Sequence, residues 1–266
     1  MKQRVITGVL GASGFLILLW LGNWWYSGLL LFLATFAFLE YAQMNRLSWR
    51  RTPVILGIGL VWFIFVTQLP QLDAISSDPL LHDPNQLLLG LVFFLVLIVL
   101  SRNHFDIFQV AYLFIGSIYI GYGFSYMMLT IWKQNGLALT LLVIFITWAN
   151  DSAAYFIGKR FGKRKLWPEI SPNKTIEGSM AGIVFGVIMS VLIFLIFPAL
   201  GNLLKAIWLG LLISVVGQIG DLIESAWKRT TGVKDSGTIL PGHGGVLDRF
   251  DSLLFTFIVL HLVRLV

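Results

Sequence analysis

The sequence predicts an all-α, polytopic integral membrane protein with about nine transmembrane helices and a cytoplasmic N-terminus. Composition is the first reason, because 57% of the 266 residues are hydrophobic, only 12% are charged and the mean hydropathy is +0.84. Soluble domains carry about 25% charged residues. The second reason is that apolar runs of about 20 residues, the length a helix needs to cross a bilayer, recur along the chain. Lipid therefore suits this chain better than one very large soluble core.

Nine apolar segments account for the predicted helices. They are Val5–Leu21, Ser27–Tyr41, Pro53–Leu69, Leu87–Leu100, Val110–Ile131, Gly136–Tyr155, Gly178–Leu200, Lys205–Glu224 and Phe250–Val266. Lys2 and Arg4 precede the first segment, as in a signal peptide, but no small-residue cleavage site follows it. Trp24, Trp25 and Tyr26 instead resemble an aromatic belt at a membrane interface, so we expect a retained helix.

The basic residues predict the orientation. With nine crossings and the N-terminus inside, the cytoplasmic loops contain all of the 19 Lys and Arg residues except Lys133, Lys205 and Arg264. Two long polar loops, Gly158–Glu177 and Ser225–Arg249, then lie on the cytoplasmic side. We therefore expect a multi-pass protein of the cell membrane with its chemistry at the cytoplasmic face. Loops beside anionic lipid also explain the net charge of +6 without a nucleic-acid partner.

Domain organisation follows from the same pattern. We interpret residues 1–266 as a single helical membrane domain, whose catalytic region is built from residues 148–179 and 217–254. The chain has no cysteine, which excludes disulfides, thiolate metal sites, iron–sulfur clusters and a cysteine nucleophile.

Carboxylates occur in pairs within residues 217–254. Asp221 and Glu224 are three residues apart near the end of one predicted helix, and Asp248 and Asp251 repeat the spacing where the next helix begins. Carboxylates at such places are costly unless they are paired or bind a cation, and hard oxygen ligands suit Mg²⁺ that holds phosphate groups. We therefore predict Asp221, Asp248 and Asp251 as metal ligands for Mg²⁺, and leave a second cation open.

A structural alternative exists for these carboxylates. Asp251 and Ser252 are suited to cap the last helix, and Asp221 is near enough in sequence to pair with Lys228 or Arg229. For Asp221 and Asp248 we favour the metal interpretation, because a glycine-rich loop and several basic residues surround them.

That loop, Pro241–Gly245, precedes a predicted helix. Its glycines let backbone N–H groups approach an anion closely, and the positive end of the helix dipole faces the same place. Glycine before a helix is usually only a turn, so the anion-site interpretation depends on the flanking Lys228, Arg229, Lys234 and Arg249. For His243 we favour a phosphate donor over a solvated loop histidine.

Residues 148–179 form the second polar stretch, which begins with Asp151 at the end of the sixth segment. The basic cluster that follows is interpreted as a lipid-attracting cytoplasmic cluster; it comprises Lys159, Arg160, Lys163, Arg164 and Lys165. Ser171, Lys174 and Thr175 are predicted to bind nucleotide phosphates. For Thr175, an N-cap of the seventh helix is equally consistent with the sequence.

Both stretches resemble one family. The run KRTTGVKDSGTILPGHGGVLDRFD, with Ser225 ahead of it, resembles the signature of the phosphatidate cytidylyltransferases. The segment from Asp151 to Gly158, followed by SPNKTIEG, is similar to the family's second region. Trp227 and Ser152 depart from the usual residues but leave the charged positions intact, and the resemblance covers essentially the whole chain.

The resemblance implies that CTP and phosphatidic acid condense to CDP-diacylglycerol and pyrophosphate, in a homodimer embedded in membrane lipid. The expected catalytic residues are Asp221, Asp248, Lys228, Arg229, Lys234, His243 and Arg249. The expected substrate-binding residues are Asp151, Ser171, Lys174, Thr175, Ser225, Asp235, Gly244 and Gly245.

Two other functions fit parts of the pattern. A CTP-dependent lipid-alcohol kinase would transfer the γ-phosphoryl group to a polyprenol or a related hydroxyl and would release CDP instead of pyrophosphate. A transporter would use intramembrane carboxylates to bind ions, but it should place them near the midplane or on both sides. In this sequence the charges gather on one predicted face, so the transporter ranks last.

Overall fold

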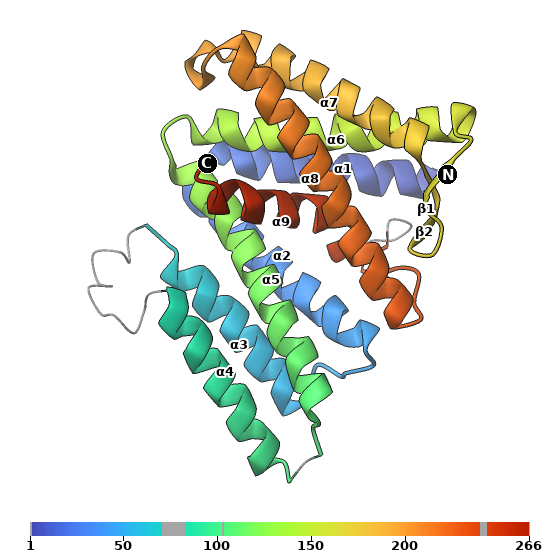
Figure 1. Ribbon diagram of the computed structural model, residues 1–266. Helices are drawn as coiled ribbons and strands as arrows, with labels where there is room; N and C mark the ends of the chain where they lie inside the picture. The colour runs from blue at the N-terminus through green and yellow to red at the C-terminus, as the bar shows by residue number, and fades with distance from the viewer. Residues whose placement is uncertain (1, 71–82, 103, 240–243, 266) are drawn as a thin grey trace. The chain divides into compact units, whose positions relative to one another are not determined.

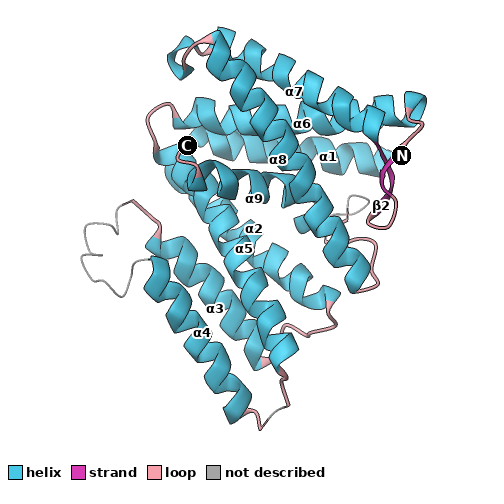
Figure 2. Cartoon of the chain, in the orientation of Figure 1, coloured by secondary structure: helices cyan, strands magenta, loops and turns pink. Residues whose placement is uncertain are grey.

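The computed structural model describes residues 2–70, 83–102, 104–239 and 244–265, and these are almost entirely helical (Figures 1 and 2). The helices are α1 (Lys2–Leu21), α2 (Asn23–Met44), α3 (Thr52–Thr67), α4 (Asp83–Leu100), α5 (Ile107–Trp132), α6 (Gly136–Phe161), α7 (Ile176–Ile196), α8 (Leu203–Thr230) and α9 (Leu247–Leu262). A short 3₁₀ helix, Pro198–Leu200, lies between α7 and α8. The all-α prediction is confirmed.

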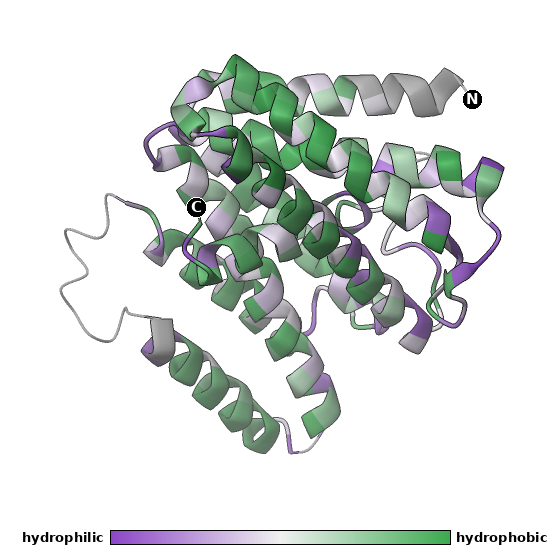
Figure 3. Ribbon diagram, turned by 45° about the horizontal axis from the view of Figure 1, so that its top comes forward, coloured by the Kyte–Doolittle hydropathy of each residue, from purple (hydrophilic) through white to green (hydrophobic). Residues whose placement is uncertain are grey.

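Five helices of the described chain, α2, α5, α6, α7 and α8, are long and apolar enough to cross a membrane. Shorter apolar helices occur at Leu10–Leu21, Thr52–Thr67 and Asn85–Leu100. Large apolar side chains are exposed on the protein surface, including Trp20 at 77% and Phe108 at 80%. Figure 3 shows hydrophobic residues along the helices and hydrophilic ones mainly in the connecting segments. Exposed apolar side chains together with five long apolar helices are typical of a chain surrounded by lipid, so the chain is a membrane protein. The count of nine crossings and the orientation stay predictions.

The described chain forms two compact units. The first comprises Met1–Trp132 and Asp235–Arg249, and the second comprises Lys133–Lys234 and Phe250–Val266. Helix α9 begins in the first unit and continues in the second, so one helix belongs to both.

In the first unit, α2 packs against α3 and α5. Small residues allow the close approach, because a Cβ at Gly57 would collide with the ring of Phe38. A tyrosine pair locks α2 to α5: the rings of Tyr41 and Tyr112 stack at 4.2 Å. Each hydroxyl donates to the other residue's carbonyl oxygen, at 3.0 Å and 2.7 Å. This pair fixes the turn of α2 that also carries Glu40.

In the second unit, α6, α7 and α8 pack together. Polar side chains join them in the interior: Gln218 Nε2 of α8 donates to Asn150 Oδ1 of α6 at 2.8 Å, and Ser179 Oγ of α7 donates to Gln218 Oε1. Buried polar groups need such partners, and this network holds the part of α6 that carries Asp151.

Helix α9 crosses α8 closely within the second unit. A Cβ at Gly220 would lie 2.9 Å from both the carbonyl oxygen of Asp251 and the Cβ of Phe255. Only a glycine leaves room for this contact, which places the residue after it, Asp221, beside the first turns of α9.

The sequence prediction missed a β-hairpin between α6 and α7. Strand β1 (Lys165–Trp167) pairs antiparallel with β2 (Ser171–Thr175), with Lys165 opposite Thr175 and Trp167 opposite Ser171. Strand β2 is the SPNKT segment, which contains the predicted site residues Ser171, Lys174 and Thr175.

Candidate active site

Three carboxylates from three helices come near one another in the second unit. The charges of Asp221 (α8) and Asp251 (α9) both act on Asp151 (α6), and the charge of Asp221 also acts on Asp251. Like charges repel, so this arrangement needs cations to balance it.

Lys174 supplies one cation. Its Nζ lies 2.6 Å from Oδ2 of Asp221, and both side chains are partly exposed, at 26% and 31%. Ser225, one turn further along α8, donates to Oδ1 of Asp221 at 3.3 Å. The structure therefore brings together residues that the sequence placed in two separate polar stretches.

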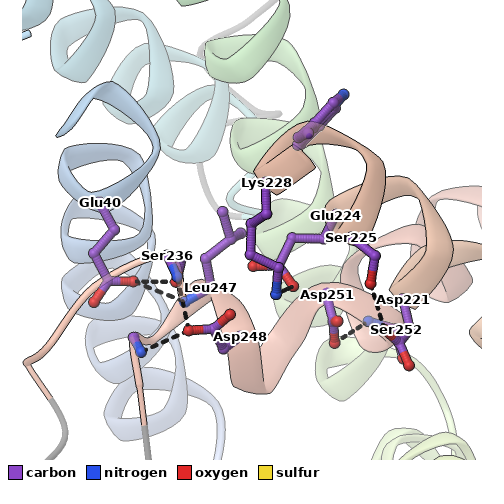
Figure 4. A network of polar contacts seen from close by, with 12 residues as sticks. Glu40, Asp221, Glu224, Ser225, Lys228, Ser236, Leu247, Asp248, Asp251 and Ser252 are labelled. Carbon is purple, nitrogen blue, oxygen red and sulfur yellow. Dashed lines mark hydrogen bonds and ion pairs between the residues drawn. The ribbon is translucent and has the colours of Figure 1, made fainter. Parts of the chain in front are cut away.

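The next turn of α8 holds a more deeply buried pair. Lys228 Nζ donates to Glu224 Oε2 at 2.9 Å, and the Glu224 side chain is 1% exposed. Glu224 also interacts with the side chain of Asp251. Figure 4 shows Glu224, Lys228 and Asp251 together on α8 and α9. Lys228, which we had considered as a partner for Asp221, pairs with Glu224.

The hairpin is tied to the helices around it. Arg229 Nε donates to the carbonyl oxygen of Ile170 at 3.1 Å. Thr175 caps α7, because its Oγ1 accepts the N–H of Gly178 at 3.2 Å. The carboxylate of Glu177 accepts the backbone N–H groups of Lys163 and Arg164 at 3.0 and 3.2 Å. The N-cap interpretation of Thr175 is confirmed, and the hairpin is held where Lys174 meets Asp221.

The segment before α9 belongs to the first unit and folds around Asp248. Oδ2 of Asp248 accepts the N–H groups of Ser236 at 2.9 Å and Gly245 at 2.8 Å. Gly244 has φ +80°, a left-handed conformation that suits glycine. The N–H of Gly245 thus points at a carboxylate of the chain. Substrate binding by Gly244 and Gly245 stays a prediction.

Glu40 is the residue that sequence reasoning missed. Its side chain lies buried, with 1% of the residue exposed. Its Oε1 accepts the N–H of Val246 and its Oε2 that of Leu247, both at 2.9 Å. Ser236 Oγ lies 3.4 Å from Oε2 (Figure 4). The sequence did contain a signal for Glu40, which is the lone carboxylate of the predicted membrane helix Ser27–Tyr41. Such a residue usually marks a function or a specific partner.

The remaining predicted site residues have less defined surroundings. Lys234 and Asp235 are exposed on the segment that joins α8 to α9, Arg249 is exposed in the first turn of α9, and Ser171 is half-buried at the start of β2. His243 lies outside the described residues.

The donor set fits Mg²⁺ by its chemistry. Across residues 2–70, 83–102, 104–239 and 244–265, no three His, Asp or Glu side chains form a preformed metal cluster. Mg²⁺ does not require one, because proteins usually hold it through one or two carboxylates together with substrate phosphates. Within the second unit, the neighbouring carboxylates Asp221 and Asp251 offer such ligands.

Comparison with known proteins gives a consistent result. Residues 2–266 match the model of a family described as the cytidylyltransferase family. A phosphatidate cytidylyltransferase of Bacillus subtilis is 40% identical over 259 residues, which are 96% of this chain and 94% of the relative. Proteins of the same name from Staphylococcus haemolyticus and Staphylococcus epidermidis are 36% and 39% identical over 267 residues, which are 99% of this chain and 98% of each relative.

Proposed function

Because this chain belongs to the cytidylyltransferase family, we propose that it transfers the cytidylyl group of CTP to phosphatidic acid and produces CDP-diacylglycerol and pyrophosphate. The observation that carries this proposal is the contact of Lys174 with Asp221, which lies beside Asp151 and Asp251. Cationic and anionic groups in contact suit a reaction between two phosphate-bearing substrates that needs charge balance.

The chemistry asks little of a general base. A phosphate monoester has a second pKa near 6 and is already an anionic nucleophile at neutral pH. Its difficulty is repulsion from the triphosphate, so the protein contributes mainly position and electrostatics for an in-line attack on the α-phosphorus. Lys174 is suited to bind a phosphate oxygen, because its ammonium lies beside the carboxylates and its side chain is partly exposed.

We further propose Asp221, Asp248 and Asp251 as ligands of Mg²⁺, with a second cation still open. When bound, the ion would neutralise phosphate charge and align the reacting groups. The closeness of Asp221 and Asp251 supports this assignment within the second unit. In the first unit, Asp248 is held by two backbone N–H groups.

The setting of the reaction is also part of the proposal. The C-terminal halves of α6 and α8 carry Asp151 and Asp221, the hairpin carries Lys174, and α6 leads toward that end of the second unit into the basic cluster of residues 159–165. We propose that this end faces the cytoplasm, from which CTP arrives, while phosphatidic acid approaches through the cell membrane. The N-terminus is then cytoplasmic, and the working protein is a homodimer.

Product analysis tests the proposal. The purified full chain in mixed micelles would receive Mg²⁺, phosphatidic acid and CTP labelled at the α-phosphorus. We expect the label in a lipid and free pyrophosphate, with both lost when EDTA removes the divalent cation. Absence of labelled lipid would overturn the proposal. CDP formed on addition of a polyprenol would establish the lipid-alcohol kinase instead.

A further inference from the structure

We propose that Glu40 is a positioning residue for cytidylyl transfer, whose carboxylate anchors the described parts of the segment before α9, residues 235–239 and 244–249, and thereby sets the position of Asp248. This inference rests on the proposed function. It assigns a role in the reaction to a residue of α2 that lies far in sequence from both polar stretches.

The first argument is the geometry of the carboxylate. The two oxygens of Glu40 accept two successive backbone N–H groups, those of Val246 and Leu247, each at 2.9 Å. These groups lie at the start of α9, where backbone N–H groups have no partner within the helix. A carboxylate accepts at both oxygens, whereas an amide presents an NH₂ group at one of them. The site therefore selects Glu over its isostere Gln.

The second argument is the tight packing of the segment around this side chain. A Cβ at Gly237 would lie 2.6 Å from Oε1 of Glu40, and a Cβ at Gly245 would collide with Oε2 of Glu40 and with Oγ of Ser236. Two glycines thus let the backbone approach the carboxylate from two sides. Because these atoms are in such close contact, a shift of the Glu40 side chain would also shift the backbone at Gly237 and Gly245.

The third argument connects Glu40 to Asp248. Ser236 donates its backbone N–H to Asp248 at 2.9 Å, and its Oγ lies 3.4 Å from Glu40. Gly245 donates to Asp248 at 2.8 Å, and Val246, the next residue, donates to Glu40. The two carboxylates therefore hold adjacent groups of one segment, so loss of either frees the backbone that positions the other.

Burial of the Glu40 carboxylate costs free energy, and this cost favours a role for Glu40 beyond stability. A buried charge is expensive, and well-packed apolar residues of similar volume often replace buried ionic groups without loss of stability. The helix turn that carries Glu40 is also rigid, because the adjacent Tyr41 forms two hydrogen bonds with Tyr112. A positioning residue requires a rigid backbone and a carboxylate that accepts hydrogen bonds in fixed directions.

The experiment compares Glu40→Gln with Asp106→Asn in the full chain, purified in detergent. Asp106 is the matched control, because its carboxylate also accepts an N–H at a helix start, that of Gln109 at 2.7 Å, and it lies outside the proposed site. Hydrogen–deuterium exchange of peptides spanning residues 235–249 is measured beside kcat and the KM for CTP. For Glu40→Gln we expect faster exchange in these peptides and a kcat lower by about 10- to 100-fold, since small misplacements of catalytic groups cost rates of this order. Asp106→Asn should match the wild type in both.

Gly237→Ala provides a second route, because it pushes the segment away from Glu40 and alters no polar group. If Glu40→Gln does not fold, Gly237→Ala tests the positioning role by the same two measurements, hydrogen–deuterium exchange and kcat. Exchange at the wild-type rate, or faster exchange with an unchanged kcat, would overturn the positioning role. If the wild type makes no CDP-diacylglycerol, the proposed function fails and the positioning role falls with it, while the exchange data still report whether Glu40 anchors the segment.

Discussion

Lys174 Nζ lies 2.6 Å from Asp221 Oδ2, which joins the second strand of the hairpin to the C-terminal half of α8. The contact places a cation within a group of carboxylates that includes Asp151. Because the pair is partly exposed, its main contribution is to the local charge and not to folding.

Lys174→Ala tests that distinction. We expect the rate of cytidylyl transfer to fall by about 100-fold, as when one preorganised charge-stabilising group is removed. Thermal unfolding should shift by less than the equivalent of about 1 kcal/mol. Lys163→Ala is the control, because its exposed side chain belongs to the basic cluster, and it should reduce the rate only modestly. Equal losses in both variants would mean that general positive charge, and not this contact, matters.

Asp248→Asn should abolish turnover while the protein remains folded in detergent. An amide keeps one acceptor oxygen for the N–H groups of Ser236 and Gly245 but carries no charge for a cation. Turnover and size-exclusion behaviour are the measurements. Activity close to that of the wild type would remove Asp248 from the proposed metal ligands.

Gly220→Ala should weaken the crossing of α8 and α9. The added Cβ would lie 2.9 Å from Asp251 and Phe255, and overpacking of this kind costs about 1–3 kcal/mol. The matched control is Gly217→Ala on the same helix, where the nearest atom to an added Cβ, Thr256 Oγ1, is at an ordinary 3.6 Å. Thermal unfolding of both variants decides: similar midpoints would show that the close crossing tolerates a methyl group.

Thr175→Ala should lower the free energy of unfolding by about 1 kcal/mol, the usual cost of losing an N-cap. Thr175→Ser keeps the hydroxyl that accepts the N–H of Gly178 and should restore most of this stability. A serine variant as unstable as the alanine variant would assign the loss to the missing methyl group instead.

The positions of the helices could largely be predicted from the sequence, because apolar length is a strong signal in a membrane protein. Their ends were harder to predict. We expected one helix to end at Tyr155, but α6 continues to Phe161. Lys159 and Arg160 extend it, since basic residues in the last turn interact favourably with the helix dipole.

The hairpin and the Glu40 contacts could not be predicted in the same way. Strands β1 and β2 have three and five residues, and the second contains a proline, so neither shows the alternation that identifies a strand. Glu40 meets partners that are 196 to 207 residues away in sequence. Local patterns contain no information on such a pairing, whereas Asp221 and Asp248 were recognised because acids and bases surround them in sequence.

The distance between Glu40 and its partners also matters during biosynthesis. A ribosome delivers α2 to the membrane long before it has translated Ser236, Val246 and Leu247. Throughout that interval the nascent chain carries a carboxylate toward the C-terminal end of α2 (Asn23–Met44) without the partners that will hold it, and a charged residue in a membrane helix opposes insertion. The apolar neighbours of Glu40 must therefore secure insertion alone, and the arrival of α9 completes a helix that was inserted among the first.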